Sequence, residues 1–147
     1  MLASMKLRVM LADDHTLYRE GLRMFLELEP DMEVVAEVTD GYGVLREFGP
    51  TQPDVVLMDI GMPGLSGIDT TRQLLAIEPN ARVIGLSAHV DLPRVAAMIG
   101  AGAMGYAIKG SAGAELLVAI RRVRLNQHYF DAALGIKTAL LNKSKFG

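Results

Sequence analysis

The sequence predicts one α/β domain, built on a doubly wound parallel sheet of five strands with helices on both faces. Two observations carry this prediction. Short apolar runs alternate with helical patterns from the start of the chain to about residue 126, and such alternation is typical of parallel sheets. The chain has 147 residues, of which half are hydrophobic, and this suffices for one core but not for a second full domain.

Apolar runs mark the five expected strands. They are Leu7 to Leu11, Glu33 to Val38, Val55 to Met58, Val83 to Leu86 and Gly105 to Ile108. Between the first two strands, Tyr18, Leu22, Phe25 and Leu26 recur at helical spacing and predict the first helix, which ends at Pro30.

The second helix is expected to be short, over Val44 to Phe48, because glycines precede it and Gly49-Pro50 follows it. The remaining helices are expected over Thr70 to Ile77, Leu92 to Ala101 and Ala114 to Leu125, with a possible short helix over Ala132 to Leu141. The fifth helix places Leu116, Ile120 and Val123 on one apolar stripe.

Composition narrows the classes of function. The 15 basic and 17 acidic residues give a net charge of -2, so the chain has no basic surface of the kind that grips nucleic acid. It contains no cysteine, which excludes disulfides, thiolate metal sites and a cysteine nucleophile. No segment resembles a signal peptide or approaches the roughly 20 apolar residues of a membrane span. We therefore expect a cytoplasmic protein without membrane contact.

Polar groups stand at the ends of four expected strands. Asp13 and Asp14 follow the first strand, Asp59 follows the third, Ser87 the fourth and Lys109 the fifth. The carboxyl ends of parallel strands form one crevice, and three carboxylates in one crevice need a cation to offset their repulsion. The pattern predicts a site for Mg²⁺ and a phosphoryl group.

Each of these residue types has a role in phosphoryl transfer. Asp59 is the candidate nucleophile, because a carboxylate can attack phosphorus and form an acyl phosphate. Asp13 and Asp14 offer the oxygen ligands that Mg²⁺ prefers, and the backbone carbonyl of Gly61, in the turn after Asp59, could add another. Taken singly, the same residues are more often helix caps, turn residues or solvated charges, so the prediction depends on their joint placement.

Lys109 and Ser87 complete the expected site. An ammonium and a hydroxyl suit the equatorial oxygens of a phosphoryl group, one as a point charge and the other as a hydrogen-bond donor. Two histidines lie close by in the sequence. His89 is expected at the rim, either as a solvated loop residue or as a group that tunes hydrolysis of the acyl phosphate. His15 is expected at the start of the first helix near the acidic residues, and neither His15 nor His128 has the spacing of a metal-binding pair.

The chain resembles the receiver domain of two-component response regulators over about residues 6 to 126. The matching segments are Val9-Met10-Leu11-Ala12-Asp13-Asp14-His15, Pro53 to Pro63 around Asp59, Leu86-Ser87-Ala88 and Gly105-Tyr106-Ala107-Ile108-Lys109. Details such as Asp-Asp-His look closest to the LuxR/NarL-type transcriptional branch. The resemblance implies a flavodoxin-like (CheY-like) fold with strand order 2-1-3-4-5. It also implies Asp59 as phosphoacceptor, with Mg²⁺ at Asp13, Asp14, Asp59 and the Gly61 carbonyl.

The resemblance further implies which partners the chain has, how far its catalytic activity extends and where its domain begins and ends. The phosphate donor would be a sensor histidine kinase, a receiver face would mediate homodimerisation, and the chain would catalyse only its own phosphorylation and dephosphorylation. Residues 1 to 5 are expected to be an extension, and residues 127 to 147 a connector toward a C-terminal DNA-binding domain that this sequence does not include. A truncated form is favoured over a stand-alone receiver.

Some alternatives stay open at this stage. Tyr106 matches the family's switch position, where its ring would turn inward as Ser87 moves toward a phosphoryl group, but it could equally be a fixed, half-buried aromatic packed on the fourth helix. The geometry of the Lys109–Gly110 peptide is also open. A haloacid-dehalogenase-like phosphatase would use a similar nucleophile and metal, but it requires a second aspartate where Gly61 stands and a cap domain for which there is no room.

Overall fold

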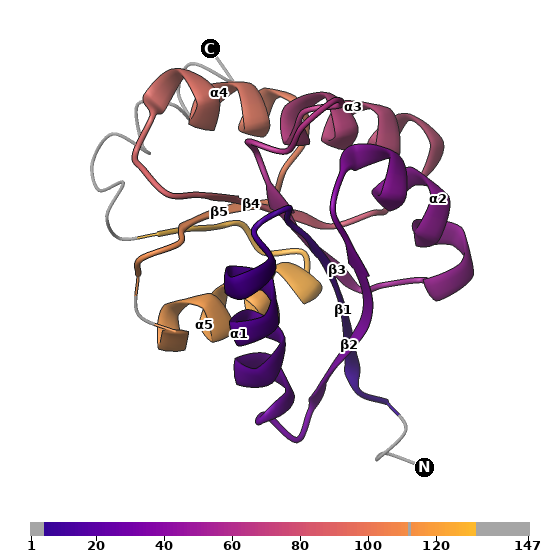
Figure 1. Cartoon of the computed structure of the whole chain (residues 1–147), viewed down its shortest axis with the longest axis vertical. Coiled ribbons are helices and arrows are strands. Elements are labelled where there is room, and N and C mark those ends of the chain that lie inside the picture. The colour runs from indigo at the N-terminus through magenta and orange to yellow at the C-terminus, as the bar shows by residue number, and fades with distance from the viewer. Residues whose placement is uncertain (1–4, 112, 132–147) are drawn as a thin grey trace.

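The computed structural model describes residues 5–111 and 113–131. Its sheet contains the five expected strands, which Figure 1 labels, and one more. The strands are β1 (Leu7–Ala12), β2 (Met32–Val38), β3 (Val55–Asp59), β4 (Val83–Ser87), β5 (Gly105–Ile108) and β6 (Tyr129–Phe130). All pairs are parallel, in the order β2-β1-β3-β4-β5-β6. The predicted fold class and strand order are confirmed, and β6 is an addition that the sequence pattern did not indicate.

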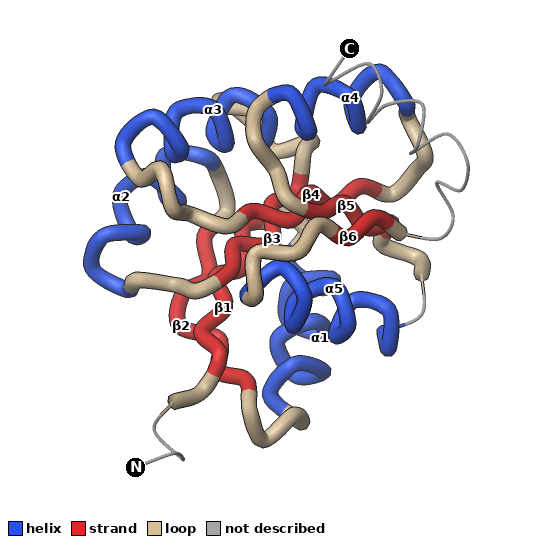
Figure 2. Tube along the Cα trace, turned by 180° about the vertical axis from the view of Figure 1, so that it is seen from behind, coloured by secondary structure: helices blue, strands red, loops and turns tan. Residues whose placement is uncertain are grey.

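Five helices cover the two faces of this sheet among the described residues. They are α1 (Thr16–Glu27), α2 (Gly41–Thr51), α3 (Gly67–Ile77), α4 (Leu92–Gly100) and α5 (Gly113–Arg124). Figure 2 shows the strands as a central layer, with α1 and α5 on one side and α3 and α4 on the other. None of these helices is long and apolar enough to cross a membrane.

Each face of the sheet has its own apolar core. Val9 and Leu11 of β1 lie in the core formed with α1 and α5, whereas Met10 and Ala12 lie in the core formed with α2, α3 and α4. Successive side chains of a strand point to opposite faces, so a sheet covered on both sides needs unbroken apolar strands. The uninterrupted apolar runs seen in the sequence have this origin.

Helix α2 is longer than predicted, because its glycines are packing residues and not helix breakers. An added Cβ at Gly41 would collide with the Thr70 hydroxyl of α3, and one at Gly43 would lie 2.8 Å from Cβ of Val38 in β2. The Asp40 side chain caps the helix by accepting a hydrogen bond from the Gly43 amide at 2.8 Å. The predicted bounds of Val44 to Phe48 were therefore too narrow at both ends.

Smaller differences concern helix ends. Helix α3 begins at Gly67, before the predicted Thr70, because Ser66 caps it by accepting from the Asp69 amide at 3.1 Å. Pro50 lies inside α2, where the preceding Gly49 has no Cβ to clash with the proline ring. The expected short helix over 132–141 lies outside the described residues.

Candidate functional site

The acidic residues predicted from the strand ends converge at one edge of the sheet. Asp13 follows β1 and Asp59 ends β3, and both are buried, with exposed fractions of 2% and 4%. Asp14 is exposed. One ligand atom from each of Asp13, Asp14, His15 and Asp59 lies within 4.8 Å of the others. The strands β1 and β3 are direct neighbours, which brings together carboxylates that stand far apart in the sequence.

Lys109 places its ammonium among these carboxylates. Its Nζ lies 2.6 Å from Oδ2 of Asp13 and 3.4 Å from Oδ2 of Asp59. The Lys109 amide donates to the Ser87 carbonyl at 2.8 Å, so β4 and β5 fix where the side chain starts. The Lys109–Gly110 peptide is trans, as are all the peptide bonds of the described residues. The structure thus brings three of the predicted site residues into direct contact.

The Asp59 carboxylate sits in an environment that disfavours its charge. Burial raises the pKa of Asp59, and the nearby Asp13 charge raises it further. The Gly61 amide, which donates to Oδ1 at 3.0 Å, and the Lys109 ammonium oppose this rise without cancelling it. The Asp59 oxygen that faces Lys109 is consequently a basic carboxylate oxygen at the end of a strand, as a nucleophile requires.

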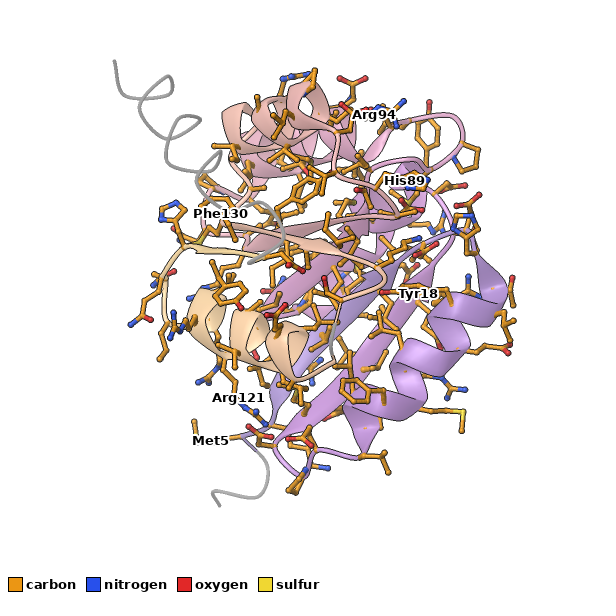
Figure 3. All side chains as sticks on the ribbon, turned by 90° about the vertical axis from the view of Figure 1, so that its left-hand side faces the viewer. Met5, Tyr18, His89, Arg94, Arg121 and Phe130 are labelled. Atoms are coloured by element: carbon orange, nitrogen blue, oxygen red, sulfur yellow. The ribbon has the colours of Figure 1, made fainter. Side chains whose placement is uncertain are left out.

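A cleft of about 200 Å³ opens beside Asp59. Its lining includes Asp59, Gly61, Ser87, Lys109, His89 and Arg94. Figure 3 labels the last two, His89 in the loop before α4 and Arg94 in α4. The Ser87 hydroxyl donates to the backbone carbonyl of His89. The predicted nucleophile, hydroxyl and ammonium therefore face one small cleft, which is large enough for a phosphoryl group.

Tyr106 lies entirely inside the molecule. Its side chain is 0% exposed and passes over Gly85, where an added Cβ would stand 3.0 Å from Cδ2 of Tyr106 and 3.1 Å from Cε of Met98. Burial raises the pKa of Tyr106, and the nearby Ser87 hydroxyl opposes this, although the Tyr106 hydroxyl makes no hydrogen bond of good geometry with the described residues. The ring occupies the inward position, more buried than the half-buried alternative expected from the sequence.

Two further residues stand at the site: His15, which the sequence placed near the acidic residues without a role, and Tyr18, which it did not assign to the site. His15 Nδ1 lies 3.2 Å from Oδ1 of Asp13 and 3.7 Å from Oδ2 of Asp59. The Tyr18 ring lies under the Lys109 ammonium, 4.7 Å from Nζ to its centroid. Burial, Asp13 and Asp59 raise the pKa of Tyr18 to about 12, so the phenol stays neutral. The only sequence signal was that both residues follow the Asp13-Asp14 pair within one helical turn.

The acidic cluster fits a hard divalent cation. Three carboxylates supply oxygen ligands of the type that Mg²⁺ takes. Oδ2 of Asp59 is buried and accepts no hydrogen bond of acceptable geometry from the described residues, and buried polar atoms without such a partner are uncommon. The donor set and this oxygen both suit a metal ion held between Asp13, Asp14 and Asp59.

Comparison with known proteins agrees with this site. Residues 9–121 match the family described as response regulator receiver domain. The chain is 42% identical over 115 residues to the transcriptional regulatory protein LiaR of Bacillus subtilis, covering 78% of this chain and 54% of LiaR. It is 37% identical over 134 residues to the response regulator UvrY of Escherichia coli, covering 91% of this chain and 62% of UvrY. The chain therefore spans roughly half to three-fifths of the length of these relatives.

Solved structures point in the same direction. A LuxR-family two-component response regulator from an Aurantimonas species superposes with a TM-score of 0.86 at 32% identity, covering 97% of this chain and 99% of that chain. The signal receiver domain of the putative response regulator NarL from Mycobacterium tuberculosis superposes with a TM-score of 0.79 at 34% identity, covering 83% and 98%. The chain belongs to the response regulator receiver domain family, in its LuxR/NarL-type branch.

Proposed function

We propose that this receiver takes a phosphoryl group onto Asp59 from a phosphohistidine of a sensor histidine kinase. The carboxylate oxygen forms the new bond to phosphorus while the phosphorus–nitrogen bond breaks and the imidazole leaves as the neutral base after taking up a proton. The observation that carries this proposal is the position of Asp59 Oδ2, which faces the Lys109 ammonium at 3.4 Å beside the open cleft. Phosphoryl transfer depends mainly on such positioning and charge.

The surrounding residues would divide the remaining tasks. Asp13, Asp14 and the Gly61 carbonyl would hold Mg²⁺ together with Asp59, and the ion would neutralise charge on the phosphoryl oxygens. Lys109 contacts the carboxylate that gains the phosphoryl group, so the same ammonium can pair with a phosphoryl oxygen after transfer. Chemistry of this kind is limited to the domain's own phosphorylation and dephosphorylation, and we propose no separate enzymatic activity.

Ser87 and Tyr106 would connect the site to the surface. The Ser87 hydroxyl now donates to the His89 carbonyl, and a phosphoryl oxygen on Asp59 is a stronger, charged acceptor for it. Turning the hydroxyl toward that oxygen breaks its hydrogen bond to the loop between β4 and α4, and the Tyr106 ring lies nearby, over Gly85 of β4. Shifting a two-state equilibrium from 1:99 to 99:1 takes about 5.5 kcal/mol, and phosphorylation would supply part of it by favouring the inward Tyr106 ring seen here.

The effect of phosphorylation on transcription would depend on segments outside the receiver domain. Residues 6–126 would act as the receiver, residues 1–5 as an extension and residues 127–147 as a connector to a DNA-binding domain. We propose this arrangement because LiaR is a transcriptional regulatory protein, and the chain spans only part of LiaR and of UvrY. Phosphorylation would promote homodimerisation and so control transcription in the cytoplasm. A stand-alone receiver that signals through protein contacts is the alternative.

Intact mass spectrometry tests the central step. Incubation with Mg²⁺ and a small acyl-phosphate donor should add one phosphoryl group to the wild type and none to Asp59→Asn. Chelation of Mg²⁺ should abolish labelling as well. Asp69→Asn, an exposed aspartate on α3, is the matched control and should be labelled like the wild type. Labelling that persists in Asp59→Asn would reject Asp59 as the acceptor.

A further inference from the structure

We propose that His15 is a nitrogen ligand of the metal site, which gives this receiver a preference for divalent transition-metal ions over Mg²⁺. This inference rests on the proposed function, because it concerns the same site. It adds a ligand that the acidic residues alone do not provide. The chemical class of cofactor is a borderline divalent cation such as Co²⁺, Ni²⁺ or Zn²⁺.

The positions of the ligand atoms carry the inference. His15 Nδ1 lies 3.2 Å from Oδ1 of Asp13, 3.9 Å from Oδ1 of Asp14 and 3.7 Å from Oδ2 of Asp59. Ligands held about 2.1 Å from one metal ion stand about 3.0 Å apart at right angles and about 4.2 Å apart on opposite sides. All three separations fall within that range, so the imidazole nitrogen is placed to share one ion with each of these carboxylates, whose ligand atoms lie within 4.8 Å of one another.

The polar contacts of His15 Nδ1 conflict with one another. Oδ1 of Asp13 lies 3.2 Å from Nδ1 and can accept a hydrogen bond only if Nδ1 carries a proton. The Lys109 ammonium lies 3.1 Å from Nδ1 and can donate to it only if Nδ1 has a free lone pair. A neutral imidazole nitrogen carries one or the other, so one of these contacts is unsatisfied in either tautomer. A metal ion between these groups takes the nitrogen lone pair and removes the conflict, while Oδ1 of Asp13 keeps the hydrogen bond that it accepts from the His15 amide at 2.8 Å.

A buried oxygen supports the same conclusion independently. Asp59, 4% exposed, directs Oδ2 toward His15 and Lys109 but accepts no hydrogen bond of acceptable geometry there from the residues the structure describes. The Asp13 carboxylate can serve two partners at once, since Oδ2 pairs with Lys109 while Oδ1 faces His15. Lys109 therefore keeps an anionic partner when a metal ion occupies the His15 side.

Helix capping does not account for His15. The residue occupies the N-cap position of α1, but its side chain makes no capping hydrogen bond. Its side chain is 67% exposed, so no packing requirement holds the ring over the carboxylates. The nitrogen changes the selectivity of the site because imidazole suits transition metals, whereas Mg²⁺ prefers oxygen ligands throughout.

Calorimetric titration of the whole chain with MgCl₂ and with CoCl₂ tests the proposal. The variants are His15→Gln and, as matched control, His128→Gln, whose ring stacks on Phe130 away from the acidic residues. We expect His15→Gln to weaken Co²⁺ binding by about tenfold or more, since loss of even an outer partner of a metal ligand costs about 10- to 100-fold. Mg²⁺ affinity should change far less, and His128→Gln should match the wild type.

Pulsed EPR of bound Mn²⁺ gives a second readout. The wild type and His128→Gln should show coupling to a directly bound nitrogen, and His15→Gln should not. Equal losses of Mg²⁺ and Co²⁺ affinity in His15→Gln, or an unchanged ratio of the two, would overturn the role of His15 while leaving the phosphoacceptor assignment intact. A wild-type chain that binds neither ion would overturn both, and the phosphorylation assay would then also fail.

Discussion

Asp59 illustrates how a reactive residue can cost stability. Its carboxylate is buried beside Asp13, and these surroundings raise the pKa of Asp59 in spite of the Gly61 amide and the Lys109 ammonium. The folded protein therefore holds the Asp59 proton more tightly than the unfolded chain does. Ionising the carboxyl group in the fold costs free energy that an exposed aspartate would not require.

Replacing this carboxylate should stabilise the fold at neutral pH. The folded pKa lies above the ordinary value of 3.8, so wild-type stability falls as pH rises from 3.8 through the folded pKa. Asp59→Asn cannot ionise and escapes that loss. Urea denaturation without divalent ions should show equal midpoints below the ordinary pKa and a higher midpoint for Asp59→Asn above the folded pKa.

Divalent ions should reverse this order. A ligand present at 100 times its dissociation constant stabilises the native state by about 2.7 kcal/mol, and only the wild type retains the full acidic set. A midpoint for Asp59→Asn that is below the wild type at neutral pH without Mg²⁺ would contradict the account of the pKa.

Lys109 should compete with the metal ion. Its ammonium lies 2.6 Å from Asp13 and 3.4 Å from Asp59, and unit charges about 4 Å apart near a protein surface interact by roughly 4 kcal/mol. Lys109→Gln should therefore raise Mg²⁺ affinity by about tenfold, or about 1.4 kcal/mol, while it lowers phosphoryl labelling. Calorimetry with Mg²⁺ measures the first effect, and intact mass the second. Lys109→Arg keeps the charge and should not raise the affinity.

The carboxylates and Lys109 could be placed from the sequence because they stand at strand ends, where topology alone determines their neighbourhood. His15 could be placed near them but not given a role, and Tyr18 could not be placed, since their contacts depend on how α1 leaves β1 and on the path of the Lys109 side chain. The burial of Tyr106 was also beyond sequence reasoning. It depends on the space above Gly85, in a neighbouring strand.

At the scale of elements, α2 shows that a glycine predicted to precede a helix can lie inside it. The sequence suggested that Gly41 and Gly43 delay the helix, but both lie within it, where α2 packs closely on α3 and β2. Local propensity disfavours glycine in a helix by about 1 kcal/mol, and tertiary packing overrides it here. The strands were predicted almost to the residue, because unbroken apolar runs have no competing interpretation once helices flank them.

Two glycine-to-alanine variants separate packing from propensity. Gly41→Ala should destabilise the domain, because its Cβ would collide with the Thr70 hydroxyl and crowd Leu65, and overpacking typically costs about 1 to 3 kcal/mol. Gly21→Ala in α1 has nothing within 4 Å of the new Cβ and should stabilise it by about 0.5 to 1 kcal/mol. Thermal denaturation of both variants should give shifts of opposite sign. Stabilisation by both substitutions would mean that Thr70 and Leu65 make room for the new Cβ at Gly41 without strain.

At the scale of the whole molecule, β6 joins the segment after α5 to the strand that carries Tyr106 and precedes Lys109. Tyr129 and Phe130 pair with Gly105 and Tyr106, and the Asp131 amide donates to the Tyr106 carbonyl at 2.9 Å. Two residues give no periodic pattern, so the sequence could not reveal this strand. The chain beyond α5 is thereby in direct backbone contact with the proposed switch.

The side chain of Asp131 adds a second contact between the segment after α5 and β5. The residue is 3% exposed, and its carboxylate accepts a hydrogen bond from the Ile108 amide at 3.2 Å. Asp131→Ala removes that acceptor, and leaving a buried amide unpaired costs about 1 to 3 kcal/mol. We expect destabilisation of this size in denaturant unfolding, together with faster hydrogen exchange at Ile108 and Lys109.

Asp131→Asn is the conservative variant that tests whether the lost hydrogen-bond acceptor causes the destabilisation of Asp131→Ala. Asp131→Asn keeps an oxygen acceptor for Ile108 and should retain most of the exchange protection, while its stability reports the replacement of one carboxylate oxygen by a neutral NH₂ group. If Asp131→Ala leaves exchange at Ile108 and Lys109 unchanged, β6 does not hold the end of β5 in place. Slow exchange that depends on Asp131 and changes on phosphorylation would show that the segment after α5 responds to the state of Asp59 through a continuous hydrogen-bonded sheet.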